Sequence, residues 1–207
     1  MSHTALSEAF LEACRLEGCP LCRVQQAADL RYLERLFYES VNDYSLRQQL
    51  RASLGFCGTH ARQALNETQG QALGLAIIYE DLLRVILEQI DQKSTLAAPV
   101  KPCPACQNRD EITARVISEL SANILTGQVQ SALAASQGLC LGHLRQALLQ
   151  MRDAGKRNIL IQIQREIMQV LRNDLAEYVR KNDYRFMDEA PGSEKDAWIR
   201  AVRMVAG

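Results

Sequence analysis

A pattern of cysteine and histidine that occurs twice constrains this chain more than any other feature. A Cys-Pro-x-Cys pair stands at residues 19–22 and again at residues 103–106. A Gly-x-Cys-x-x-His element follows each pair, at residues 55–60 and 138–143, so that Cys57 lies 35 residues after Cys22 and Cys140 lies 34 residues after Cys106. Arg-Gln-Ala-Leu follows both histidines at the same distance. This agreement predicts duplication of one unit into two tandem repeats related by a pseudo-twofold.

The spacing within each element predicts metal ligands. Two cysteines separated by two residues can direct both sulfurs at one ion, and proline after the first cysteine suits the first turn of a helix. A cysteine and a histidine three residues apart lie on the same side of one helical turn. Taking each half of the chain by itself, we expect two sites of three cysteines and one histidine: Cys19, Cys22, Cys57 and His60 in one, and Cys103, Cys106, Cys140 and His143 in the other. The spacing leaves open an exchange of elements between the halves.

Three thiolates and one imidazole are typical of a structural zinc site. All four positions of the tetrahedron come from the protein, so no position remains for a water nucleophile, and the pattern argues against a zinc hydrolase. We therefore expect two structural zinc ions.

Two redox interpretations compete with zinc. Cys14, Cys19 and Cys22 followed by Cys57 resemble the cysteine spacing of plant-type ferredoxins, which indicates an iron–sulfur cluster as the alternative. The position equivalent to Cys14 in the second half is Ala98, so we expect Cys14 to lie outside the shared site. A Cys-Pro-x-Cys pair at a helix start is also a thiol–disulfide redox arrangement, although no thioredoxin-like βαβ pattern surrounds it here.

Helical periodicity predicts an all-α fold, since strand and hairpin signals are weak. We expect a first repeat over residues 1–98, a second over 99–182, and a tail with a short docking helix over 183–207. Residues 71–93 are apolar around most of a helical circumference, which predicts a helix running through the core.

Composition narrows the function classes. The 24 basic and 24 acidic residues cancel, so no net field attracts nucleic acid or an anionic membrane. No apolar run is long enough to span a bilayer, and the N-terminal residues lack a signal-peptide pattern. Seven cysteines, an odd number, fit a disulfide framework poorly, so we expect a cytoplasmic protein. No phosphate loop or nucleophile elbow is present, which favours an interaction or adaptor protein with a protein partner over an enzyme.

Several of these motifs occur together in a known pattern. The Cys-Pro-x-Cys pair is followed by a Tyr-Leu-x-x-Leu-x-Tyr-Glu stretch at residues 32–39, then by Gly-Phe-Cys-x-x-His, and the chain closes with a helix containing Trp198. The combination resembles an uncharacterised prokaryotic family known only as a domain of unknown function, over nearly the whole chain. The resemblance supports the metal ligands and implies no activity.

Overall fold

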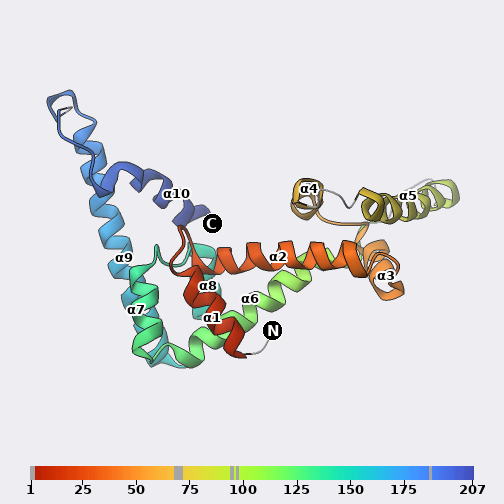
Figure 1. Ribbon diagram of the computed structural model, residues 1–207, viewed down its shortest axis with the longest axis horizontal. Helices are drawn as coiled ribbons and strands as arrows, with labels where there is room; N and C mark the ends of the chain where they lie inside the picture. Colours follow the sequence, from red (N-terminus) through yellow and green to blue (C-terminus); the bar gives the residue numbers. More distant parts are fainter. Residues whose placement is uncertain (1–2, 68–71, 94–95, 97, 187) are drawn as a thin grey trace. The chain divides into compact units, whose positions relative to one another are not determined.

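The computed structural model of the protein describes every residue except 1–2, 68–71, 94–95, 97 and 187. The described residues form helices and no strand, in the order that Figure 1 shows. The α-helices are α1 (His3–Ala13), α2 (Pro20–Glu39), α3 (Tyr44–Ser53), α4 (Gly58–Glu67), α5 (Ala72–Lys93), α6 (Pro104–Asn123), α7 (Gly127–Ala135), α8 (Leu141–Gln150), α9 (Ala154–Lys181) and α10 (Ala197–Ala206). Two 3₁₀ turns, η1 (Tyr184–Phe186) and η2 (Ser193–Asp196), connect α9 to α10. The expected all-α fold with a duplicated plan is confirmed, and no described helix is long and apolar enough to cross a membrane.

The chain divides into two compact units, and neither is one half of the sequence. Unit 1 comprises Met1–Val24 and Thr113–Gly207, and unit 2 comprises Gln25–Ile112. The divisions fall inside α2 and α6, so each of these two helices begins in one unit and ends in the other. The boundary that we expected after residue 98 separates the two sequence repeats, not the two compact units. The boundaries of the repeats therefore stay a prediction.

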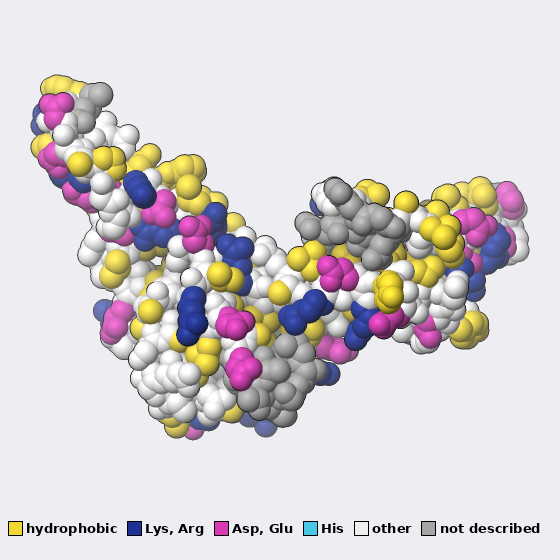
Figure 2. All heavy atoms as spheres, viewed as in Figure 1, with side chains coloured by type: hydrophobic (Ala, Val, Ile, Leu, Met, Phe, Trp, Pro, Cys, Tyr) yellow, Lys and Arg dark blue, Asp and Glu magenta, His cyan; other side chains and the backbone are white. Residues whose placement is uncertain are grey.

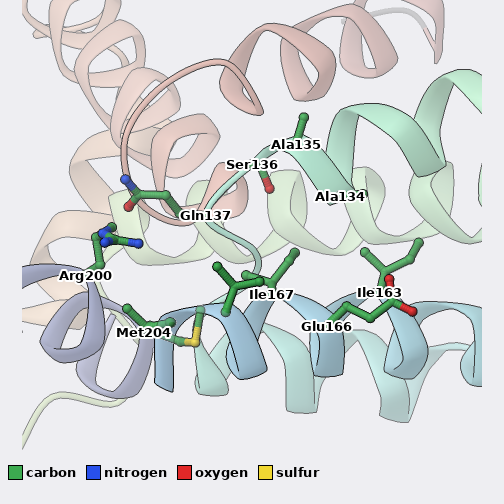
Figure 3. Close-up of a pocket in the computed structure, with 11 residues that line it drawn as sticks. Ala134, Ala135, Ser136, Gln137, Ile163, Glu166, Ile167, Arg200 and Met204 are labelled. Atoms are coloured by element: carbon green, nitrogen blue, oxygen red, sulfur yellow. The ribbon is translucent and has the colours of Figure 1, made fainter. Parts of the chain in front are cut away.

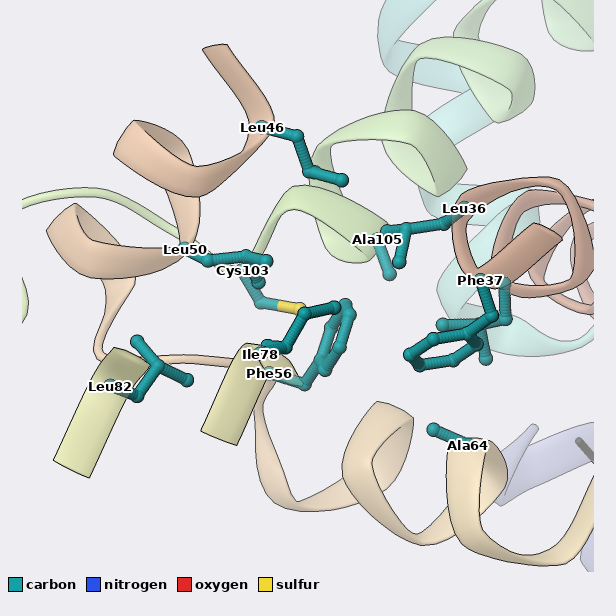
Figure 4. Close-up of a cluster of buried hydrophobic side chains, with 11 residues drawn as sticks. Leu36, Phe37, Leu46, Leu50, Phe56, Ala64, Ile78, Leu82, Cys103 and Ala105 are labelled. Atoms are coloured by element: carbon teal, nitrogen blue, oxygen red, sulfur yellow. The ribbon is translucent and has the colours of Figure 1, made fainter. Parts of the chain in front are cut away.

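The core of unit 2 collects side chains from each helix of that unit. Figure 4 shows this cluster, whose buried members are Leu33, Leu36, Phe37, Leu46, Leu50, Phe56, Ala64, Ile78, Leu82, Cys103 and Ala105. The rings of Phe37 and Phe56 meet edge to face with centroids 6.1 Å apart. Because Cys103 is part of the cluster, one expected metal ligand is anchored directly in hydrophobic core.

We expected helix α5 to run through the core, but only one side of it is buried there. One side of it is buried through Gly74, Ile78, Asp81 and Leu82. The opposite side leaves apolar side chains exposed, with Leu73 at 74% the most accessible among them. The prediction from its overall hydrophobicity was wrong for that side, because α5 covers one flank of unit 2 and nothing in the described chain packs over it.

Unit 1 is organised around α9, against which α7 and α10 pack. The C-terminal helix α10 docks through Ala197 and Met204, which meet Leu171 of α9. Salt bridges from Lys181 to Glu194 (2.9 Å) and from Arg200 to Asp174 (2.9 Å) hold the turn before α10. Figure 3 shows an open cavity of about 470 Å³ between the end of α7, α9 and α10.

A glycine with a left-handed backbone conformation precedes each Cys-x-x-His element, two residues before its cysteine. Their φ angles are +94° at Gly55 and +76° at Gly138. A Cβ atom added at Gly138 would lie 2.9 Å from Nε2 of buried Gln164, and one added at Gly55 would lie 3.1 Å from Cδ1 of Leu82. Both positions therefore require glycine for backbone conformation and for space.

We expect Gly138→Ala to lower the free energy of unfolding by about 1–3 kcal/mol, the usual cost of a left-handed non-glycine residue. Denaturant unfolding of the full chain measures this change. Gly127→Ala is the matched control, because a Cβ there meets nothing within 4 Å and its φ is not positive. Equal stability changes in the two variants would contradict the argument.

Candidate metal centres

The eight residues expected as ligands gather in two groups of four. Within each group, ligand atoms all lie within 4.8 Å of one another. The α2/α8 group contains Cys19, Cys22, Cys140 and His143, and the α4/α6 group contains Cys57, His60, Cys103 and Cys106. Our expectation that each half of the chain forms its own group was wrong: the Cys-Pro-x-Cys pair of one repeat meets the Cys-x-x-His element of the other. Each group lies entirely within one compact unit, and Cys14 belongs to neither group.

Helix length explains the exchange. Helix α2 has 20 residues, so at 1.5 Å per residue it carries the chain about 30 Å away from Cys19. Helix α3 has only 10 residues, and Cys57 follows shortly after it, so this segment does not bring Cys57 back to the start of α2. The second repeat has the same plan, with 20 residues in α6 and 9 in α7. These lengths are the sequence signal that could have indicated exchange.

Every ligand pair sits at the start of a helix. The backbone carbonyl of the first cysteine in each pair accepts a hydrogen bond from the N–H four residues later, at 2.8–3.1 Å for Cys19, Cys57, Cys103 and Cys140. Each of these cysteines thus directly precedes the first helical turn, and its partner ligand lies in that turn three residues later. The positive end of the helix dipole stabilises thiolate at such positions.

In the α2/α8 group, His143 turns its Nδ1 atom toward all three sulfurs. The Nδ1 atom lies 3.2 Å from Sγ of Cys140, 3.4 Å from Sγ of Cys22 and 3.5 Å from Sγ of Cys19. The sulfurs of Cys22 and Cys140 are 3.8 Å apart. Four donor atoms from helix starts 118 residues apart in sequence therefore face one common point.

The α4/α6 group repeats this arrangement. Nδ1 of His60 lies 3.2 Å from Sγ of Cys57, 3.4 Å from Sγ of Cys106 and 3.7 Å from Sγ of Cys103. The sulfurs of Cys57 and Cys106 are 3.6 Å apart. Nη2 of Arg109 lies 3.9 Å from Sγ of Cys106 and places a positive charge beside this thiol.

The thiols of one group cannot all ionise easily without a cation. Although burial raises it, hydrogen bonds from the backbone and side chain of His60 and from Cys106 lower the pKa of Cys57 to about 7. Burial and the hydrogen bond with Cys57 raise the pKa of Cys106 to about 12. In the α2/α8 group, hydrogen bonds among the thiols likewise lower the pKa of Cys140 and raise that of Cys22. A bound metal dication supplies the charge that stabilises all three thiolates together.

A buried carboxylate orients one of the histidines. The His60 side chain is fully buried, and its Nε2 lies 3.2 Å from Oδ2 of Asp29 on α2. Burial raises the pKa of Asp29, and the neighbouring His60 side chain partly offsets this effect. A carboxylate behind the second ring nitrogen fixes the tautomer that presents Nδ1 to a metal. Sequence analysis missed Asp29. The signal that could have indicated it is an acidic residue between two apolar ones, Ala28 and Leu30.

The second repeat supports its cysteine differently. The buried Gln164 side chain accepts a hydrogen bond from the N–H of Leu139 (2.9 Å) and donates one to its carbonyl (3.0 Å), which holds the residue before Cys140. Thr113 occupies the position equivalent to Asp29 and is also buried. No sequence signal singled out Gln164, because its role depends on the packing of α9 against the segment before α8.

We expect Asp29→Asn to weaken metal binding by the α4/α6 group about 10- to 100-fold, the usual effect of removing a carboxylate that supports a histidine ligand. The variant is made in a Cys22→Ser, Cys140→Ser background, so that only the α4/α6 group remains complete. Competition against a chelator of known affinity measures the change. Asp91→Asn, at an exposed position of α5, is the control and should not alter affinity. Unchanged affinity in Asp29→Asn would show that the carboxylate does not support His60.

Comparison with known proteins agrees with the duplicated plan. A family model described as a family of unknown function (DUF6062) matches the chain twice, over residues 3–124 and 92–207. An "uncharacterized 23.9 kDa protein in xynA 3'region" of Caldicellulosiruptor sp. (strain Rt8B.4) is 32% identical over 208 residues, which cover 96% of this chain and 99% of that protein. No solved structure matches. The resemblance seen in the motifs is confirmed, and the chain belongs to the DUF6062 family of unknown function.

Proposed function

We propose that the protein is a helical scaffold held together by two structural zinc ions, and that it serves as an interaction or adaptor protein. The observation that carries the proposal is the geometry of the two groups. A single zinc ion with Zn–S bonds of about 2.3 Å and a Zn–N bond of about 2.05 Å has S–S edges of about 3.8 Å and S–N edges of about 3.6 Å. The sulfurs of Cys22 and Cys140 (3.8 Å) and of Cys57 and Cys106 (3.6 Å), and the sulfur–nitrogen separations of 3.2–3.7 Å, are close to these edges.

The same distances favour one ion over an iron–sulfur cluster, the alternative function. A cluster distributes its protein ligands over two or more iron atoms, so ligands on different irons are separated by more than one tetrahedral edge. In both groups one Nδ1 atom is within 3.7 Å of every sulfur. Such close packing supports a single ion rather than a cluster with bridging sulfide.

A closed set of four protein ligands supports a structural role. With no coordination position left for substrate or water, the ion acts by holding two helix starts together. None of the seven cysteines is joined in a disulfide, which suits a reducing compartment such as the cytoplasm. The exposed apolar side of α5 supports an interaction role.

Elemental analysis of the purified full chain tests this proposal. We expect two zinc ions per chain and no visible absorption, because zinc has a filled d shell. Iron with acid-labile sulfide and a visible spectrum that bleaches on reduction would establish the cluster instead. Metal-free protein with disulfides within the two groups would overturn both.

A further inference from the structure

The exposed side of α5 carries a regular seam. Six exposed residues follow one another at alternating steps of three and four, which we call the α5 seam: Leu73, Ala76, Glu80, Leu83, Leu87 and Ile90. This spacing is the one by which two helices pack along a common stripe. Leu83, Leu87 and Ile90 are 58%, 57% and 45% exposed, and Figure 2 shows hydrophobic side chains on the visible surface in the region of α5, beside charged ones. Residues of this kind normally lie inside a protein or an interface.

The duplication supplies an internal comparison for the seam. Helix α9 is the counterpart of α5 in the second repeat, and the glycine contacts fix the alignment: Gly55 faces Leu82, and Gly138 faces Gln164. Buried Ile78 and buried Leu160 then also correspond. At the six positions equivalent to the seam, all exposed, α9 carries Gly155, Asn158, Gln162, Arg165, Gln169 and Arg172. These exposed positions therefore do not require an apolar residue, and at these six positions the apolar side chains are specific to α5.

We infer that the α5 seam binds the α5 seam of a second copy of this chain, with the two helices antiparallel. Antiparallel pairing aligns the seam with itself about a twofold axis. Leu73 then meets Ile90 of the second copy, Ala76 meets Leu87, and Glu80 meets Leu83. The small Ala76 faces a large leucine, so the layers can interlock. The inference does not depend on the metal sites.

Charge complementarity selects this occupant and this direction. In the antiparallel pair, Glu80 lies on the same side and at nearly the same height as Arg84 of the second copy, so two carboxylates and two guanidinium groups gather at the twofold axis. Arg84 already lies along the α5 surface, 2.7 Å from Asp81 and 2.8 Å from Glu88. Parallel pairing would set Glu80 directly against Glu80 of the second copy, which like charges oppose. A self-complementary seam with its own counter-charge points to a second copy rather than to a different protein.

Sedimentation velocity of the full metal-loaded chain at up to about 100 μM tests the inference, since small interfaces associate weakly. We expect a reversible species of twice the 23.2 kDa chain mass. The double variant Leu83→Arg, Leu87→Gln introduces the residue types that α9 carries at the equivalent positions, Arg165 and Gln169. It should be monomeric with its helicity unchanged. Leu149→Arg with Val179→Gln is the control, because these apolar residues are exposed outside the seam and should leave the dimer intact.

Charge reversal distinguishes the antiparallel pair from other contacts. Glu80→Arg alone and Arg84→Glu alone should each be monomeric, because each places like charges around the twofold axis. An equimolar mixture of the two variants should form a heterodimer, because one chain then carries arginine at both positions and the other carries glutamate at both. A monomeric wild type, a dimer that survives the leucine substitutions, or a mixture that fails to associate would each overturn the inference.

Discussion

The Cys22→Ser, Cys140→Ser double variant should retain one tightly bound metal ion per chain, and the Cys22→Ser, Cys57→Ser double variant should retain none. The first pair removes two ligands from the α2/α8 group and leaves the α4/α6 group complete. The second pair removes one ligand from each group, so neither closed set of four survives. If each half of the chain formed its own site, the two variants would exchange results.

The measurement is metal content per chain after dialysis against a chelator. The Cys22→Ser single variant sets the chelator strength, which must remove metal from a group of three ligands and spare a complete one. Cys14→Ala is the control and should keep both ions, since Cys14 is buried but belongs to neither group. This set of variants tests the exchange without requiring a second structure.

Removal of both ions should cost the protein its cooperative folding. Structural zinc binds peptides with an apparent free energy of about 10–16 kcal/mol, which is comparable to the total stability of an ordinary domain, about 5–15 kcal/mol. Ions in the two groups would also tie together residues that are far apart in sequence, 118 positions between Cys22 and Cys140 and 49 between Cys57 and Cys106. Without the ions, no metal-binding free energy offsets the entropic cost of bringing these distant helix starts together.

Thermal melting followed by circular dichroism, with and without chelator, checks this expectation. We expect the metal-free chain to lose the sharp transition and part of its helical signal, and zinc to restore both. Magnesium, which prefers oxygen ligands, is the control and should restore neither. Coincident melting curves would show that hydrophobic packing alone maintains both units.

Much of the fold followed from local properties of the chain. Periodicity predicted helices because an apolar stripe with a 3.6-residue period can be buried only by a helix. The same reasoning failed for α5, since hydrophobicity around a helix does not show which side has a neighbour. There, Ile78 is buried while Leu83 and Leu87 are exposed, and only packing separates them.

The candidate metal ligands were readable in the sequence, because a Cys-x-x-Cys or Cys-x-x-His pair is completed within a single helical turn. Which two turns meet was not readable in the same way. That choice depends on where the 20-residue helices α2 and α6 carry the chain, and on buried contacts such as those of Asp29 with His60 and of Gln164 with Leu139. A spacing of three residues is a local constraint, whereas the pairing of sites 118 residues apart is settled only when the helices pack.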